Sequence, residues 1–258
     1  MADAPVRIER AGPVAWCTVE RPPLNLLEPG LIRALGATFA DLAADGALRA
    51  VVLTGGGRAF CAGMDVRVLG DLDGPGAREL ITALHAAIEA VHHSPVPVVA
   101  AVNGPCLGAG FELALACDIR LASADAIFGL PEVRVGVPSV IEAALLPPLV
   151  GPGRAAELAL TGEAIPAERA LGWGLVNQVV EAPRLRDAVE ALLTKILKAG
   201  PGAVRLQKRL LVRWRYSDLE TAIRAGIEAF VEAYATGEPA EGAEAFLAKR
   251  APRFEGGR

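Results

Sequence analysis

Asn103-Gly-Pro-Cys-Leu-Gly108-Ala-Gly-Phe-Glu112-Leu-Ala-Leu-Ala-Cys117, which follows the apolar run Val98-Val-Ala-Ala-Val102, decides the fold of this chain. The apolar run predicts a buried strand, the glycines after it predict a turn, and residues 108–117 predict a short helix. Glu112 stands in a run from residue 95 to residue 117 that is otherwise almost uncharged. Because an ionised carboxylate is costly to bury, this position predicts a functional group.

A second carboxylate, Glu132, closes the segment Phe128-Gly-Leu-Pro-Glu132. Two acids that reach the interior from separate segments indicate a place where protons are moved. Each glutamate alone also has a simpler interpretation. Glu112 could complement the dipole of a helix N-terminus, and Glu132 could be a surface residue after a proline turn.

Composition indicates a globular protein and argues against several function classes. The 258 residues are 52% hydrophobic and 22% charged, which is typical of a folded chain that can bury a large core. The net charge of −4 gives no general attraction for nucleic acid or an anionic membrane. Four scattered cysteines and three histidines lack the spacing of a disulfide framework or a zinc site.

The compartment is predicted from the N-terminus, which has no apolar stretch that could act as a signal sequence. We therefore expect a cytoplasmic protein. The apolar segment 95–117 is long enough to span a membrane, but its prolines and glycines divide it into strand, turn and helix. No membrane partner is predicted.

Periodicity predicts an α/β core followed by a helical C-terminal extension. Strands are expected at 14–19, 50–54, 98–102, 119–122 and 126–128, and helices at 29–44, 80–91, 108–117 and 141–150. From about residue 153 only helices are expected, at 153–160, 166–171, 184–199, 202–214 and 217–235. An apolar helical appendage at a chain end is often a subunit contact, so we expect a homo-oligomer.

Two glycine-rich turns follow predicted buried strands, at residues 55–65 and 103–110. Neither has the spacing of a phosphate-binding loop or a dinucleotide fold. If the turns meet in space, their backbone N–H groups could form an oxyanion hole. The histidines have no catalytic context in the sequence, and Ser139 lacks the Gly-x-Ser-x-Gly elbow of a serine hydrolase.

These residues, taken together, resemble the enoyl-CoA hydratase/isomerase (crotonase) family. The main signature is Asn103-Gly-x-x-x-Gly-x-Gly-x-Glu112-Leu-x-Leu-x-Cys-Asp118. Shorter matches precede and follow it in order: Arg21-Pro-Pro-x-Asn25, Phe60-Cys-Ala-Gly-Met-Asp65, Phe128-Gly-x-Pro-Glu132-Val-x-x-Gly136, Gly153-Arg-Ala-x-x-Leu-x-Leu-Thr-Gly162-Glu, Ala170-x-Gly-x-Gly-Leu-Val176 and Glu241-Gly-x-x-Ala-Phe-x-x-Lys249-Arg. The order of these matches over nearly the whole chain makes the resemblance specific.

The resemblance implies a crotonase-like α/β spiral of repeated β-β-α turns at 1–195 and a helical trimerisation region at 196–258. It also implies trimers, often paired into hexamers, and an acyl-CoA thioester as substrate. No metal or redox cofactor is implied; coenzyme A is part of the substrate. The predicted CoA and substrate contacts are Leu26, Arg58, Ala62, Met64, Asp65, Arg67 and Gly108.

Catalytic roles are implied by the same resemblance. The backbone N–H groups of Met64 and Ala109 would bind the thioester oxygen. Glu112 would act as the base toward a water molecule, and Glu132 would donate a proton to the α-carbon of a 2-enoyl-CoA. The expected activity is therefore hydration to the 3-hydroxyacyl-CoA.

The sequence departs from the family pattern at three places. Ala109 replaces a common glycine and Leu26 replaces a usual alanine. After Gly136 the segment Pro138-Ser-Val-Ile-Glu142-Ala brings bulk and a third acid, Glu142, close to the acyl pocket. These departures leave other activities open. A double-bond isomerase that needs chiefly Glu132 is the first alternative, and an acyl-CoA decarboxylase or hydratase-lyase is another. A non-catalytic or RNA-binding member is disfavoured by the net charge.

Overall fold

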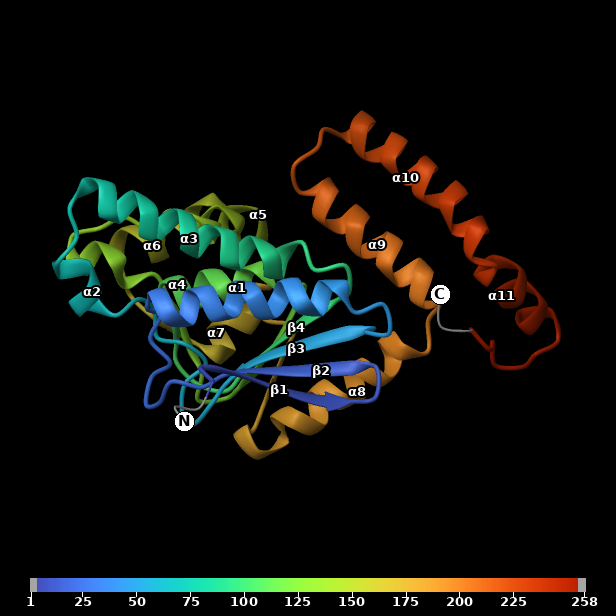
Figure 1. Ribbon diagram of the computed structural model, residues 1–258, viewed down its shortest axis with the longest axis horizontal. Helices are drawn as coiled ribbons and strands as arrows, with labels where there is room; N and C mark the ends of the chain where they lie inside the picture. Colours follow the sequence, from blue (N-terminus) through green and yellow to red (C-terminus); the bar gives the residue numbers. More distant parts are fainter. Residues whose placement is uncertain (1–3, 255–258) are drawn as a thin grey trace.

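A computed structural model describes residues 4–254 of the chain (Figure 1). Its main sheet has six strands in the order β1-β2-β3-β4-β6-β9. The first pair is antiparallel, and each of the other neighbouring pairs is parallel. The strands are β1 (Val6–Ala11), β2 (Val14–Val19), β3 (Ala50–Gly55), β4 (Val98–Val102), β6 (Ile119–Ser123) and β9 (Gln178–Val180).

Both faces of this sheet are buried, which explains why its central strands are apolar at consecutive positions. Because side chains alternate along a strand, neighbouring residues enter different cores. Val51 and Leu53 belong to the larger core, whereas Val52 packs in a smaller core on the opposite face. The sheet therefore needs helices on both sides.

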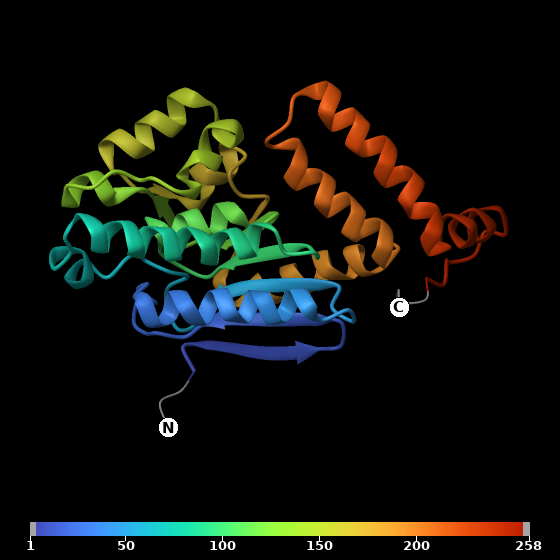
Figure 2. The same ribbon diagram turned by 45° about the horizontal axis from the view of Figure 1, so that its top comes forward.

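Helices α1 (Pro29–Ala44), α3 (Gly74–His92) and α4 (Ala109–Ala116) contribute buried residues to the larger core. Helix α8 (Leu185–Leu197) packs Leu185, Val189 and Leu193 into the smaller one. Figures 1 and 2 show α1 and α3 side by side over one face of the sheet and α8 across the other. All eight residues of α4 are buried, so Glu112 is enclosed on a helix inside the molecule.

A second sheet lies beyond the carboxyl ends of the main strands. It has three short strands in the order β5-β7-β8: β5 (Cys106–Leu107), β7 (Ile127–Gly129) and β8 (Ile165–Pro166). Short helices complete this part of the chain: α2 (Val66–Gly70), the 3-10 turns η1 (Pro131–Val135) and η2 (Glu142–Leu145), α5 (Leu146–Val150), α6 (Pro152–Thr161) and α7 (Ala167–Gly172). Glu132 stands in η1, directly after the second sheet.

The C-terminal helices are α9 (Pro201–Trp214), α10 (Leu219–Ala233) and α11 (Glu238–Leu247), with 3-10 turns η3 (Ala182–Arg184) before α8 and η4 (Tyr234–Thr236) after α10. In both views α10 and α11 extend away from the sheet, and α9 lies between them and the core (Figure 2). The division of the chain at residue 195 stays a prediction.

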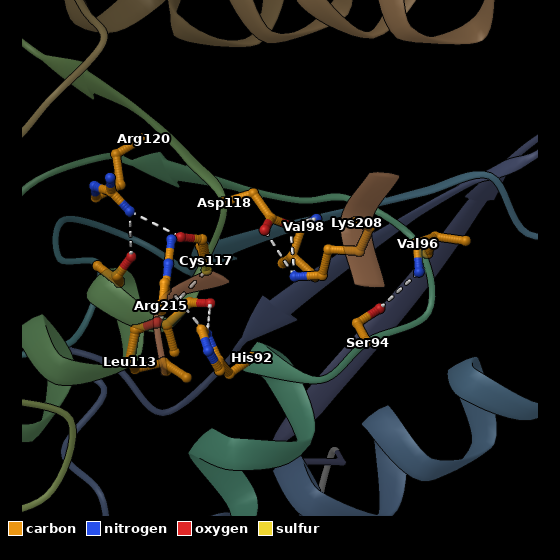
Figure 3. A network of polar contacts seen from close by, with 12 residues as sticks. His92, Ser94, Val96, Val98, Leu113, Cys117, Asp118, Arg120, Lys208 and Arg215 are labelled. Atoms are coloured by element: carbon orange, nitrogen blue, oxygen red, sulfur yellow. Dashed lines mark hydrogen bonds and ion pairs between the residues drawn. The ribbon is translucent and has the colours of Figure 1, made fainter. Parts of the chain in front are cut away.

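A buried ion pair fixes α9 to the core (Figure 3). Lys208 Nζ lies 2.7 and 2.8 Å from the two carboxylate oxygens of Asp118, and the Lys208 side chain is only 3% exposed. The same carboxylate accepts a hydrogen bond from the N–H of Val98, at the start of β4. The pair therefore joins α9 to the edge where β4 and β6 begin.

A neutral histidine makes a second link between α9 and the core. His92 Nδ1 lies 3.2 Å from the carbonyl oxygen of Ala116, and its Nε2 lies 3.1 Å from the Tyr216 hydroxyl, just after α9. Burial lowers the pKa of His92 to about 4. The imidazole is therefore uncharged at neutral pH.

Most predicted elements are present within one to two residues of their expected bounds, although α3 begins earlier, at Gly74. Two expectations were wrong. The single helix at 141–150 is instead η2 followed by α5, since Pro147 and Pro148 can begin a helix but not continue one. The expectation that only helices follow residue 153 was also wrong, because β8 and β9 are strands. They have two and three residues, which is too short to show a periodic pattern in the sequence. Strand β1 and helices α2 and α11 had not been predicted.

Among the helices of residues 4–254, none combines the length and the apolar character that crossing a membrane requires.

Candidate active site

A cavity of about 810 Å³ lies between α3, α4 and the segment 131–140. Glu112 and Glu132 both line it. The two carboxylates that the sequence singled out, 20 residues apart on different elements, thus face one space. The rest of the lining is mostly apolar, with Leu69, Leu72, Leu80, Ile81, Leu84, Val135, Val137 and Val140 among the walls.

Glu112 is held in a nearly closed environment. It is 3% exposed, and its Oε1 accepts a hydrogen bond of 3.1 Å from the backbone N–H of Ala143. Burial raises the pKa of Glu112 to about 8, and the negative charges of Glu132 and Glu142 add to this rise. At neutral pH the protonated form of this side chain is therefore favoured.

Glu132 is fixed from two sides. The Ser139 hydroxyl donates a hydrogen bond of 2.7 Å to Glu132 Oε2. Its other oxygen lies against the backbone of Gly108, because a Cβ atom at Gly108 would stand 2.7 Å from Glu132 Oε1. Gly108 also has a positive φ of 54°, so only glycine suits this position on both counts.

The two glycine-rich turns meet at the wall of this cavity, which Gly63 and Gly108 both line. A Cβ atom at Gly63 would lie 3.1 Å from the carbonyl oxygen of Leu107 and 3.7 Å from Gly108 Cα. Met64 and Ala109 follow the two glycines, and both line the cavity. Within residues 4–254 neither the Met64 N–H nor the Ala109 N–H donates a hydrogen bond to the protein. Two unused backbone donors therefore belong to residues that line the same cavity as the carboxylates.

Asparagine side chains support the turn that carries Met64. Asn25 is fully buried, and its Nδ2 lies 2.9 and 2.7 Å from the carbonyl oxygens of Gly56 and Ala59. Asn103 bonds both the N–H and the C=O of Gly55. These contacts explain what the two asparagines of the sequence motifs do, which the motifs alone did not reveal.

The predicted CoA and substrate contacts divide into two groups. Ala62, Met64 and Gly108 line the cavity. Leu26, Arg58, Asp65 and Arg67 do not; the Arg58 side chain is exposed, and Asp65 caps α2 and pairs with Arg67 at 2.6 Å. Since no ligand is part of the structure, the binding roles of all seven residues stay predictions.

Sequence reasoning missed three groups beside the carboxylates. Ser139 had been considered only as a nucleophile, and the Ala143 N–H left no signal in the sequence. His85 had no catalytic context, yet its Nδ1 lies 2.7 Å from Glu142 Oε1, across 57 residues of chain. A sequence contains no sign of such a long-range contact. Among residues 4–254 no group of three acidic, histidine or cysteine side chains is placed to hold a metal ion.

Comparisons with known proteins agree with this architecture. A model of the enoyl-CoA hydratase/isomerase family matches residues 9–257. A short-chain-enoyl-CoA hydratase from Clostridium acetobutylicum is 36% identical over 248 residues, which cover 95% of each chain. A carnitinyl-CoA dehydratase from Salmonella typhi is 33% identical and covers 97% of this chain and 98% of that protein.

A solved structure shares the whole fold. The crystal structure of an enoyl-CoA hydratase from Bacillus anthracis is similar to this chain with a TM-score of 0.93 at 33% identity, covering 98% of this chain and 99% of that one. The predicted crotonase-like fold and the predicted family are both confirmed. The chain belongs to the enoyl-CoA hydratase/isomerase (crotonase) family.

Proposed function

We propose that this protein hydrates a 2-enoyl-CoA thioester to the 3-hydroxyacyl-CoA. The observation that carries the proposal is the placement of Glu112 and Glu132 on one cavity, beside the unused N–H groups of Met64 and Ala109. The similarity to hydratases and dehydratases that act on CoA thioesters supports the same reaction class.

The two N–H groups suit the charge that develops during the reaction. Addition of water to a double bond conjugated with a thioester places negative charge on the thioester oxygen. Donors from Met64 and Ala109 would stabilise this oxygen, and loss of one such donor typically costs about 3 kcal/mol. Ala109 begins α4, so the positive end of a helix also faces the enolate.

The two carboxylates supply one acid and one base. In our assignment the oxygen of a water molecule attacks the β-carbon of the enoyl group while Glu112 takes a proton from that water. Glu132 gives a proton to the α-carbon of the same group. The reaction therefore needs one proton on the pair. After hydration that proton is on Glu112, which is also the state that burial favours in the empty site. One proton must then pass from Glu112 to Glu132 before the next hydration.

The apolar walls of the cavity support an uncharged acyl chain as the preferred substrate. Side chains from α2, α3 and the segment 135–140 provide these walls. A short or medium aliphatic chain would bury its carbons there, at roughly 0.8 kcal/mol for each methylene.

The test is a screen of enoyl-CoA thioesters of increasing length, with crotonyl-CoA as the first substrate. Glu112→Gln and Glu132→Gln should each lower the hydration rate about 100-fold or more, the scale of general acid–base catalysis. If neither replacement does so, the assigned roles are wrong.

The same variants distinguish the alternatives. An isomerase would keep most of its activity on a 3-enoyl-CoA in Glu112→Gln and lose it in Glu132→Gln. A decarboxylase or hydratase-lyase would leave crotonyl-CoA unchanged and consume a different thioester.

We also propose that the helical region 196–258 joins copies of the chain into a trimer or hexamer. Several large apolar side chains of α10 are exposed, and burial of such a face would stabilise an oligomer. They are Leu219, Ile223, Ile227, Phe230 and Val231. Sedimentation of the wild type and of Phe230→Glu tests this, because a charge on a buried face should shift the protein toward smaller species.

A further inference from the structure

A third carboxylate lies behind the proposed catalytic pair. Glu142 is the first residue of η2, and the N–H of its neighbour Ala143 donates to Glu112 Oε1. Glu142 is 7% exposed. Its charge is one of the causes of the raised pKa of Glu112, after burial and Glu132. Glu142 is thus close enough to act on Glu112 without lining the cavity.

Within residues 4–254 a single side chain contacts the Glu142 carboxyl group as an ion-pair or hydrogen-bond partner. Its Oε1 lies 2.7 Å from His85 Nδ1, whereas its Oε2 is buried and has no hydrogen-bond partner among the described residues. A buried carboxylate with one satisfied oxygen is costly in its charged form, and burial correspondingly raises the pKa of Glu142. The charge state of this side chain is therefore sensitive to its histidine partner.

His85 connects this buried acid to solvent. Its side chain is 47% exposed on α3, so its second nitrogen can exchange protons with water. The pair is neutral overall when the imidazole is protonated and Glu142 is ionised, and it is negative when only Glu142 is charged.

We infer that His85 and Glu142 are positioning residues, which together control the negative charge that faces Glu112. That charge in turn sets the pH range in which Glu112 and Glu132 together keep their one proton. This inference rests on the proposed function, since it concerns how the same site is regulated. The titratable groups that face Glu142 are His85 and Glu89 from α3, Glu112 from α4 and Tyr216 after α9.

The test is the pH dependence of kcat/KM for hydration. The rate should fall at high pH as the catalytic pair loses its last proton. Glu142→Gln removes the charge and keeps the size, so this alkaline limb should move to lower pH by about 1 unit, the scale of one neighbouring charge. Glu89→Gln is the matched control, because Glu89 is also near His85 but is 53% exposed, and it should leave the limb in place.

His85→Gln completes the cycle, and as a change at an exposed position it guards against a Glu142 variant that fails to fold. The limb should also move to lower pH in His85→Gln, because the Glu142 carboxyl group favours its neutral form once its histidine partner is gone. It should not move further when His85→Gln is added to Glu142→Gln. Equal movements in the presence and absence of the Glu142 carboxylate would overturn the inference. So would a loss of kcat without any movement of the limb, which would indicate a purely structural role.

A second readout separates this inference from the proposed function. Infrared difference spectra between the wild type and Glu112→Gln report the ionisation of the Glu112 carboxyl group directly, without any substrate. If the wild type hydrates no enoyl-CoA, the proposed function fails, whereas the infrared titration in the Glu142→Gln background still decides the inference.

Discussion

The Ser139 hydroxyl donates a hydrogen bond of 2.7 Å to Glu132 Oε2, and this contact leaves the other oxygen of Glu132 against Gly108, beside the two backbone donors. Four residues later, the Ala143 N–H holds Glu112. One short segment, 139–143, therefore positions both carboxylates. A change in this segment should act on the chemistry more than on the binding of the substrate.

Ser139→Ala tests the first of these contacts. Removal of the donor from a part-buried acceptor costs about 1–3 kcal/mol, so kcat for crotonyl-CoA hydration should fall roughly 5-fold to 100-fold with little change in KM. Ser139→Thr keeps the hydroxyl group and should retain most of the activity. Equal losses in the two variants would mean that the hydroxyl is not what positions Glu132.

Gly108→Ala should displace Glu132, because the new Cβ atom would stand 2.7 Å from its Oε1. A shift of about 1 Å at a catalytic group can cost about 100-fold in rate, and kcat/KM should fall by at least that factor. The control is Gly12→Ala, which has a similar φ of 59° but open space around it. It carries the same backbone strain, so it should lower stability and leave the rate unchanged.

Glu112→Gln should stabilise the protein at alkaline pH. Folding raises the pKa of Glu112 from the ordinary 4.5 to about 8, so the folded protein keeps this proton where the unfolded chain has lost it. The free energy of unfolding of the wild type therefore decreases as pH rises above 4.5, until the folded protein also loses the proton near pH 8. The difference in free energy of unfolding between Glu112→Gln and the wild type should therefore grow from pH 5 to pH 9. Its upper limit is about 5 kcal/mol, at about 1.4 kcal/mol for each pKa unit.

Urea denaturation at several pH values and fixed protein concentration measures this difference. Glu79→Gln, at an exposed position of α3, is the control and should show no such trend. A pH-independent difference for Glu112→Gln would contradict the raised pKa.

Lys208→Met should destabilise the fold by about 3 kcal/mol, because it leaves the carboxylate of Asp118 without its buried partner. Adding Asp118→Asn should recover part of this loss. Arg209, the next residue on α9, makes its ion pair with Glu232 on the surface. Arg209→Met should therefore cost less than about 1 kcal/mol, and comparable losses for the two single variants would contradict the role given to burial.

Local sequence predicted much of the fold, because the strands of the main sheet are buried on both faces and read as continuous apolar runs. Val51-Val-Leu53 and Val98-Val-Ala100 lie in such runs. The first strand ends at Gly55 and the second is followed by Asn103, where turns begin. The short elements were missed for the opposite reason. Strand β9 has three residues, and its pairing with β6 depends on a partner more than 50 residues away.

The amino-acid sequence by itself determined the family, the α/β core and the helical C-terminal region, and it singled out Glu112 and Glu132 as candidates. Each of these depends on local patterns or on motifs in a fixed order. Only the tertiary structure decided that Glu112 and Glu132 share a cavity, that Gly63 meets Gly108, and that His85 pairs with Glu142. The physical reason is that such contacts join distant segments through packing. Their strength depends on burial and on the neighbouring charges, which the chain acquires only when it folds.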